Sequence, residues 1–183
     1  KISIHRLVTP DRTFAFGTGD VIPASERLKC LRRIMTLCNN STPSSAGGFT
    51  GDATEVALKA CVRDMEDVED FGEYNRLSEK PFSSATKYMV TVCCNPHDQC
   101  EAYLKGAPEI VLSMCDKMML ISGESGELGK AERNWFKSAL TGMASKGERC
   151  LGFAYRPVLS SEIPASGYIF VGLAGMLDPH RKE

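Results

Sequence analysis

The most restrictive feature of this sequence is a pair of apolar runs, Tyr88–Cys94 and Cys100–Leu104, separated by the polar segment Asn95-Pro96-His97-Asp98. Two such runs around a short segment of turn-forming residues are typical of a β-hairpin. A hairpin makes its two strands antiparallel. Because other stretches have helical spacing, the sequence predicts an α/β fold with a twisted, mainly antiparallel sheet flanked by helices.

A second informative stretch is "YLKGAPEIVL", residues 103–112, in which a lysine stands between a strand-like run and a helix-like run. Pro108 suits the first turn of a helix that runs to about Cys115, because its missing N–H is not needed there. A helix N-terminus offers free backbone N–H groups, and Gly106 has no side chain to keep a ligand off the backbone. Lys105 therefore indicates a phosphate or nucleotide site, or alternatively an ordinary surface lysine at a strand–helix turn.

Two capping residues predict helices in the first half of the chain. Ser25 precedes apolar residues that keep helical spacing as far as Cys38. Asp52 precedes "ATEVALKACVRDM", and Glu55 follows three residues later, which is the pattern of a capping box. The acidic stretch Asp64–Glu73 is typical of a solvated surface.

The second half predicts one more helix and two more strands. A polar, glycine-rich loop at Ser122–Gly129 precedes a helix at Lys130–Lys146, whose spacing directs four residues inward: Trp135, Ala139, Leu140 and Met143. Cys150–Tyr155 and Tyr168–Leu177 are strand-like. The chain has no internal repeat and no long linker, so we expect one domain.

Composition narrows the class of protein. The 183 residues are 43% hydrophobic and 25% charged, which is typical of a globular domain. The net charge of −1 gives no overall attraction to nucleic acid or to an anionic membrane. The apolar run Tyr168–Leu177 is far shorter than the roughly 20 residues of a membrane helix. We therefore expect no nucleic-acid partner and no membrane insertion by this segment, and a monomer is the default.

The eight cysteines are scattered, whereas a secreted disulfide scaffold is shorter and denser in cysteine. We expect reduced thiols that lie mostly in the core. Cys93, Cys94, His97 and Cys100 raise the alternative of a zinc site. Neighbouring strand residues point to opposite faces, however, and no paired C-x-x-C motif is present, so no metal ligand is assigned.

Several common catalytic patterns are absent from the sequence. It contains neither a P-loop nor a dinucleotide fingerprint. His5, His97 and His180 are far apart and none is visibly paired with a nucleophile, so no catalytic residue is assigned.

Five segments, taken together in this order, resemble the nucleotide-binding (N) domain of P-type cation-transporting ATPases. They are "GDATEVAL" (51–58), "PFSSATKYM" (81–89), "KGAPE" (105–109), "ERCLGFAYR" (148–156) and "VGLAGMLDPHR" (171–181). The resemblance is nearest to the type II pumps, which include the sodium/potassium, proton/potassium and calcium ATPases. It covers essentially the whole chain and implies a nucleotide-binding domain at 1–177, with 178–183 beginning the hinge back to a phosphorylation domain.

The resemblance also implies which residues bind ATP: Glu55, Phe82, Ser84, Lys87, Lys105, Gly106, Ala107, Arg149, Cys150 and Leu151. Phe82 would stack on adenine, although a core phenylalanine is the alternative from the sequence alone. Lys87 and Lys105 would line the pocket, and Gly106 would let the nucleotide lie against the backbone.

The remaining assignments concern the edges of the pocket. Glu55 would accept a hydrogen bond from the adenine amino group or from a neighbouring residue, or serve only the helix cap. Arg149 would reach toward the phosphates, with Cys150 and Leu151 as wall. Ser84 stands where the family places a longer polar residue, which puts that contact in doubt.

Two segments of the family are not found in this sequence: the D-K-T-G-T segment with its phosphorylated aspartate and the magnesium-binding T-G-D-G-x-N-D segment. The resemblance places both in the phosphorylation domain, so the chain alone is expected to be inactive, with Mg²⁺ bound elsewhere. Implied partners are ATP and the phosphorylation and actuator domains of a membrane pump, with this domain on the cytoplasmic side. Asp178, His180 and Arg181 would belong to the hinge. The alternatives are an interaction module of the same fold without nucleotide binding, the zinc module, and an autonomous phosphotransferase, which the missing motifs disfavour.

Overall fold

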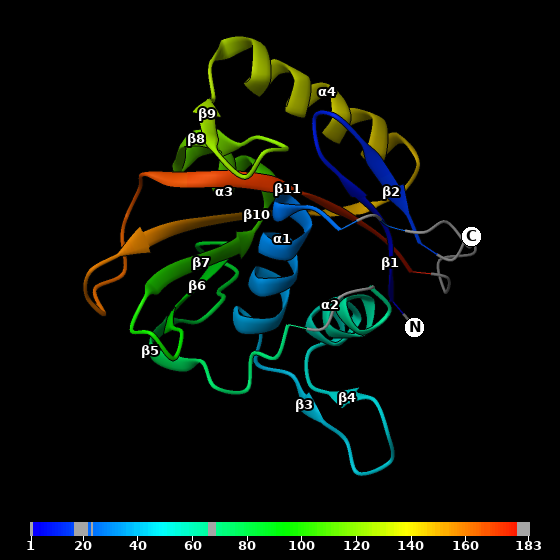
Figure 1. The fold of residues 1–183 in the computed structure, drawn as a ribbon. Coiled ribbons are helices and arrows are strands. Elements are labelled where there is room, and N and C mark those ends of the chain that lie inside the picture. Colours follow the sequence, from blue (N-terminus) through cyan, green and yellow to red (C-terminus); the bar gives the residue numbers. More distant parts are fainter. Residues whose placement is uncertain (1, 17–21, 23, 66–68, 179–183) are drawn as a thin grey trace.

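A computed structural model describes residues 2–16, 22, 24–65 and 69–178 of the protein. Within these ranges the chain forms four helices and a large sheet (Figure 1). The helices are α1 (Glu26–Leu37), α2 (Ala53–Arg63), α3 (Pro108–Ser113) and α4 (Lys130–Ser145). The strands are β1 (Ser3–Val8), β2 (Thr13–Ala15), β3 (Thr42–Pro43), β4 (Phe49–Thr50), β5 (Asn75–Lys80), β6 (Tyr88–Cys94), β7 (Cys100–Gly106), β8 (Cys115–Met119), β9 (Ser125–Glu127), β10 (Arg149–Val158) and β11 (Tyr168–Leu177).

In the described part of the chain, the main sheet has the order β2-β1-β11-β10-β7-β6-β5. Neighbours in this order are antiparallel, while β8 pairs parallel with β11 and antiparallel with β9. The predicted fold class, a mainly antiparallel sheet with flanking helices, is therefore confirmed. The first and last long strands are neighbours, with Ser3 opposite Leu177.

The predicted hairpin is formed by β6 and β7, whose register runs from the Tyr88–Gly106 pair to the Cys94–Cys100 pair. The side-chain oxygen of Asn95 accepts hydrogen bonds from the backbone N–H groups of His97 (2.9 Å) and Gln99 (3.0 Å). A side chain that bonds the backbone two residues ahead replaces part of a turn. This turn therefore fixes the register that aligns the opposite ends of both strands.

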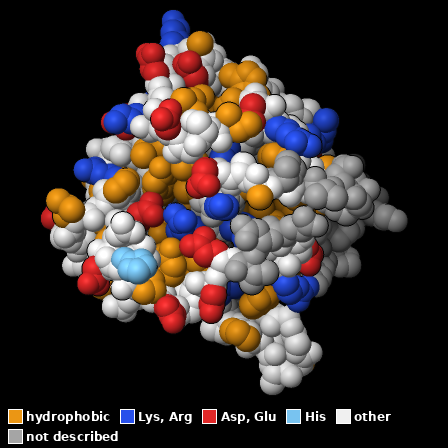
Figure 2. All heavy atoms as spheres, viewed as in Figure 1, with side chains coloured by type: hydrophobic (Ala, Val, Ile, Leu, Met, Phe, Trp, Pro, Cys, Tyr) orange, Lys and Arg blue, Asp and Glu red, His pale blue; other side chains and the backbone are white. Residues whose placement is uncertain are grey.

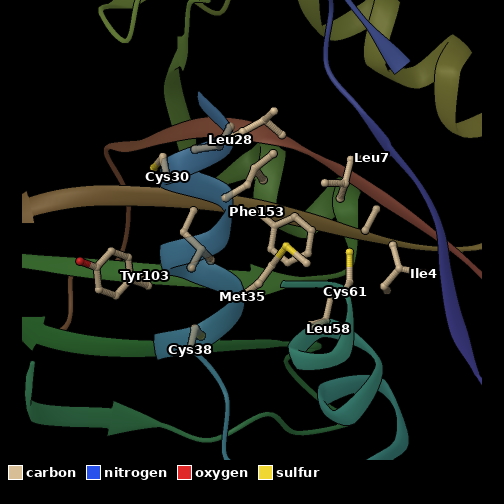
Figure 3. Close-up of a cluster of buried hydrophobic side chains, with 14 of the residues drawn as sticks. Ile4, Leu7, Leu28, Cys30, Met35, Cys38, Leu58, Cys61, Tyr103 and Phe153 are labelled. Atoms are coloured by element: carbon tan, nitrogen blue, oxygen red, sulfur yellow. The ribbon is translucent and has the colours of Figure 1, made fainter. Parts of the chain in front are cut away.

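Each face of the sheet carries an apolar layer. Met35 of α1 and Leu58 of α2 pack with Phe153 of the sheet on one face (Figure 3). On the other face, Phe136 of α4 meets Phe170 edge-on, with ring centroids 4.6 Å apart. Burying a side chain of this size contributes about 1.5–3 kcal/mol, so the two layers hold the helices against the sheet.

Both predicted capping residues are confirmed. The Ser25 hydroxyl accepts a hydrogen bond from the Leu28 N–H at 3.1 Å. The Asp52 carboxylate accepts from the N–H groups of Thr54 (3.0 Å) and Glu55 (3.1 Å). These contacts fix where α1 and α2 begin, since the first N–H groups of a helix have no partner within it.

Several predictions for local structure are wrong. β8 and β9 lie where a helix end and a loop were expected, and β5 follows the acidic stretch that gave no strand signal. Trp135 is 40% exposed, and its neighbour Phe136 takes the inward position on α4. The other predicted inward residues do face the sheet: Met143 is buried, and Ala139 and Leu140 pack against the same layer, so the error is confined to Trp135.

The expectation that all cysteines are reduced is also wrong, because Cys94 and Cys100 form a disulfide. The hairpin register places these two residues directly opposite each other. Cys93 packs in the layer under α1 and α2, on the face away from Cys94. The described residues contain no group of three or more potential metal ligands, so the zinc alternative finds no support.

Three further observations concern the surface, the helices and the predicted hinge residues. Seen from the side of α1 and α2, basic and acidic side chains are intermixed rather than gathered into patches of one sign (Figure 2). The described helices include none that is long and apolar enough to span a membrane. Of the predicted hinge residues, Asp178 is described, whereas His180 and Arg181 lie outside the described residues.

Candidate functional site

A cavity of about 460 Å³ lies between the first turn of α2 and the end of the sheet at which β6 and β10 begin and β7 and β11 finish. The antiparallel register brings these strand ends together. Tyr88 starts β6 opposite Gly106 at the end of β7, and Arg149 starts β10 opposite Met176 near the end of β11. The cavity is lined by Asn40, Asp52, Thr54, Glu55, Pro81, Phe82, Met89, Lys105, Gly106, Arg149, Cys150, Leu151 and Met176. Its volume is in the range of small-molecule sites.

An ion pair forms one wall of the cavity. The Lys105 ammonium group donates a hydrogen bond to a Glu55 carboxylate oxygen at 2.8 Å, and the two side chains are 6% and 13% exposed. A buried charge is tolerated only when it is paired and hydrogen-bonded. Lys105 is therefore a wall residue with a fixed partner, and the surface-lysine alternative is wrong.

Glu55 is held in place by the segment after α1. Its second carboxylate oxygen accepts a hydrogen bond from the Asn40 backbone N–H at 3.0 Å. The Asn39 side-chain amide donates to the Glu55 carbonyl at 2.9 Å. The carboxylate thus serves Asn40 and Lys105, where a capping box would direct it to the N–H of Asp52. The sequence predicted the cap but not these partners.

A polar network continues from Asn40 to strand β5. The Asn40 amide donates to a Glu79 carboxylate oxygen (2.6 Å), and its oxygen accepts from the Arg76 guanidinium (2.6 Å). Arg76 also donates to the carbonyl of Leu37 at the end of α1 (2.7 Å). These bonds tie the loop after α1 to the edge strand, so Asn40 is a fixed part of the cavity wall.

Phe82 lines the cavity although 56% of its surface is exposed. It belongs to a tight loop in which the Lys87 N–H donates to the Ser83 carbonyl at 2.7 Å and the Ser83 and Thr86 hydroxyl groups lie 2.7 Å apart. The loop therefore presents an aromatic ring to solvent beside the cavity. The alternative of a core phenylalanine is wrong.

Arg149 supplies a cationic group to the cavity wall, and no hydrogen-bond or ion-pair partner is found for it among the described residues. The residue before it, Glu148, accepts two hydrogen bonds from the Arg6 guanidinium of β1, one of them at 2.9 Å. The Glu148 side chain is 1% exposed. This buried pair fixes the backbone at the start of β10, while the Arg149 guanidinium stays available for an anion.

Cys150 is half-buried in the cavity wall. Burial, and then the negative charge of Glu148, raise the pKa of its thiol to about 11. A thiol reacts as the thiolate, so Cys150 is a poor nucleophile at neutral pH. Its place in the wall indicates a packing contact for a ligand and no covalent chemistry.

The structure brings together seven of the ten residues predicted to bind a ligand: Glu55, Phe82, Lys105, Gly106, Arg149, Cys150 and Leu151. Ser84, Lys87 and Ala107 are not among the lining residues. Lys87 is exposed, with a left-handed φ of 62°, and its carbonyl accepts a hydrogen bond from the Ala107 N–H at 3.0 Å. Lys87 and Ala107 thus join the Phe82 loop to the end of β7.

Gly106 has a structural reason of its own to lack a side chain. A Cβ placed there would press on the carbonyl oxygen of Lys87 and lie 2.7 Å from the Cα of Tyr88. Close packing against β6 therefore requires glycine, whether or not a ligand approaches.

Sequence reasoning missed six lining residues: Asn40, Asp52, Thr54, Pro81, Met89 and Met176. Asp52 is the predicted cap and Thr54 follows it two residues later, so both could have been included on that ground. Asn40 lies in a polar loop without periodicity, and its place at the cavity depends on the network to β5, which left no signal in the sequence.

Comparison with known proteins gives a consistent result. Residues 27–183 match the family described as P-type ATPase, cytoplasmic domain N. Curated relatives include Calcium-transporting ATPase 1 of Lactococcus lactis (32% identical over 171 residues, 89% of this chain and 19% of the relative). Potassium-transporting ATPase alpha chain 2 of Homo sapiens is 32% identical over 177 residues, covering 82% of this chain and 17% of the relative. The sodium/potassium-transporting ATPase subunit alpha of Tetronarce californica is 31% identical over 179 residues, covering 82% and 17%. The chain thus spans less than a fifth of the length of these relatives.

Proposed function

Because this chain belongs to the family of P-type ATPase cytoplasmic N domains, we propose that its cavity binds ATP by the adenosine end and directs the triphosphate outward. The observation that carries the proposal is the exposed Phe82 ring beside the buried Glu55–Lys105 pair. An aromatic ring that is exposed at a cavity offers a stacking surface for a planar base. The carboxylate of Glu55 offers an acceptor for the adenine amino group.

Charge supports this orientation. Lys105 is neutralised by Glu55 at the wall, whereas the Arg149 guanidinium has no partner among the described residues. A planar, permanently charged guanidinium suits phosphate oxygens. We therefore expect adenine between Phe82 and Lys105, with the phosphates toward Arg149. Ser84, Lys87 and Ala107 would contribute through the Phe82 loop.

The proposal for the whole protein is a cation-transporting ATPase in a membrane, with this domain on the cytoplasmic side. This domain would position ATP so that the γ-phosphate reaches an aspartate in a separate phosphorylation domain, where Mg²⁺ is bound and where an actuator domain also acts. Positioning and charge stabilisation are what phosphoryl transfer requires. Residues 1–177 would form the nucleotide-binding domain, a monomer when isolated, and 178–183 the start of the hinge.

The direct test is a titration of the purified chain with ATP, without and with Mg²⁺, followed by amide NMR shifts. We expect shifts at Glu55, Phe82, Gly106 and Arg149, with an affinity that does not depend on Mg²⁺. An absence of shifts at millimolar ATP would overturn the proposal and favour the interaction-module alternative.

A matched pair of variants sharpens the test. Phe82→Ala should weaken ATP binding roughly 5- to 150-fold, because base stacking contributes ~1–3 kcal/mol. Trp135→Ala removes another exposed aromatic ring, on α4 and outside the cavity lining, and should leave the affinity unchanged. Equal effects of the two variants would contradict a stacking role for Phe82.

The proposal also predicts that the chain alone does not hydrolyse ATP, because the sequence contains neither the family's phosphorylated-aspartate segment nor its magnesium segment. Phosphate release would be measured across the fractions of a final purification step. Steady release that follows the protein peak would show an acceptor or a metal site of its own.

A further inference from the structure

The disulfide between Cys94 and Cys100 lies outside the cavity lining and outside the proposed function. It joins the end of β6 to the start of β7, directly before the hairpin turn. The next backbone pair is closed by a hydrogen bond from the Asn95 N–H to the Gln99 carbonyl at 2.9 Å. The hairpin therefore aligns the two sulfur atoms through its own register.

The six other cysteines are free thiols. Burial raises the thiol pKa of each, to about 11 for Cys38 and Cys150 and also above the usual range for the rest. The rest are Cys30, Cys61, Cys93 and Cys115. Thiolate is the form that reacts in disulfide exchange, so these six thiols are slow to exchange at neutral pH.

A small oxidant or reductant can reach the Cys94–Cys100 pair from the turn. The four residues Pro96–Gln99 are exposed and Cys100 is half-buried. By alternation along β6, Cys94 lies on the face of Val92, whereas Cys93 is turned into the layer under α1 and α2. Cys94 is buried (6% exposed), so the disulfide is reached through Cys100 at the turn, next to the buried Cys93.

The family is described as a cytoplasmic domain, so the redox chemistry of the cytoplasm applies to this disulfide. In the cytoplasm, glutathione and thioredoxin keep most thiols reduced, and a disulfide there is usually transient and redox-sensing. We propose that Cys94 and Cys100 form a reversible redox site, which low-molecular-weight disulfides such as glutathione disulfide oxidise and which thiols reduce.

Glutathione disulfide would oxidise the two cysteines in two thiol–disulfide exchange steps. The thiolate of one cysteine attacks a sulfur of glutathione disulfide, forms a mixed disulfide and releases one glutathione thiolate. The second cysteine thiolate then attacks the protein sulfur of that mixed disulfide, forms the Cys94–Cys100 bond and releases the second glutathione thiolate. Two protein thiols lose two electrons, one glutathione disulfide gains them, and the two thiol protons end on two glutathione molecules.

The test uses the whole 183-residue chain and no nucleotide, so its outcome is independent of ATP binding. The protein is equilibrated in buffers with a series of ratios of glutathione to glutathione disulfide, quenched with acid and alkylated under denaturing conditions with a mass-tagged maleimide. We expect a loss of two of the eight reactive thiols as the buffer becomes oxidising, mapped by peptide mass spectrometry to Cys94 and Cys100 and reversed by a dithiol.

Cys93→Ala is the matched control, since it removes the neighbouring cysteine on the other face and should leave the two-thiol change intact. Cys94→Ser and Cys100→Ser should each abolish the intramolecular bond and leave a mixed disulfide with glutathione on the remaining partner. If all eight thiols stay reactive in every oxidising buffer, or if oxidation joins another pair, the proposal fails. A disulfide that a dithiol does not reduce in the folded chain would equally overturn it.

Discussion

At the scale of single residues, Lys105 and Glu55 are the most closely coupled groups of the cavity wall, with a 2.8 Å hydrogen bond between two nearly buried side chains. Lys105→Met should lower the free energy of unfolding by about 3 kcal/mol, because Glu55 is left as a buried, unpaired carboxylate. The double variant Lys105→Met/Glu55→Gln should recover part of this loss. Urea denaturation of the three proteins measures both effects.

Lys29→Met provides the control for this experiment. Lys29 also pairs with a glutamate, Glu26 at 3.4 Å, but both side chains are largely exposed. Exposed pairs contribute little, so this variant should change the free energy of unfolding by less than about 1 kcal/mol. Equal losses for the two lysines would show that the Lys105 pair is no more than a surface contact.

At the scale of secondary-structure elements, two glycines have opposite roles in their elements. Gly106 ends β7 against β6, where a Cβ would lie 2.7 Å from the Cα of Tyr88. Gly142 lies within α4 and has nothing within 4 Å of the place of a Cβ. Gly106→Ala should therefore destabilise the fold by ~1–3 kcal/mol through overpacking. Gly142→Ala should stabilise it by ~1 kcal/mol, because alanine is the better helix former.

Thermal unfolding of the two variants checks the sign of each change. Gly142→Ala should unfold at a higher temperature than the unchanged protein, and Gly106→Ala at a lower one. A Gly106→Ala protein of full stability would mean that the Tyr88 backbone can move aside. That result would remove the packing explanation for this glycine.

Many helices and strands could be predicted because their starts and turns are determined by residues close together in the sequence. Ser25 and Asp52 mark helix starts by their own side-chain hydrogen bonds, and the turn around Asn95 marks the hairpin. β5 could not be predicted in the same way, since its residues "NRLSEK" are polar and it is an edge strand paired on one side with β6. Its strand state depends on pairing with a distant segment.

The residues of the candidate site likewise differ in whether the sequence could identify them. Lys105 was predicted from its place between a strand-like and a helix-like run, whereas Phe82 and Arg149 came through the family resemblance. The antiparallel register then brings these residues to one cavity. Asn40 was missed because its role depends on Arg76 and Glu79, which are more than 35 residues away in the chain. Trp135 was misplaced because one residue of offset on a helix turns a side chain by about 100°.

At the scale of the whole molecule, we expect the five buried free thiols to lower the free energy of unfolding as the pH becomes alkaline. They are Cys30, Cys38, Cys61, Cys93 and Cys115. Burial raises each thiol pKa in the folded protein, whereas the unfolded chain has the ordinary value of about 8.5. Above about pH 9 the unfolded chain therefore loses protons that the folded protein keeps, and the free energy of unfolding falls as pH rises.

The expected slope is about 1.4 kcal/mol per pH unit for each thiol that ionises in the unfolded chain alone. For Cys38 this window ends near its folded pKa of about 11. Urea denaturation in a reducing buffer at a series of pH values measures the slope, and Cys38→Ala should reduce it by one thiol. A free energy of unfolding that stays constant from neutral to alkaline pH would contradict burial of these thiols.

The pairing of β1 with β11, Ser3 opposite Leu177, means that both ends of the described fold leave from one place. Antiparallel partners lie only about 5 Å apart, so a short linker from residue 2 to residue 178 should permit a circular permutant. New ends fit at Leu159, which is fully exposed between β10 and β11. We expect this permutant to keep the circular dichroism of the unpermuted chain, and an unfolded product would show that the β10–β11 connection is essential.

For any polypeptide that continues from these two strands, the two connections to the fold would lie next to each other. We expect the fold to turn about this point as one body, so that its cavity changes orientation while every strand of the sheet stays paired.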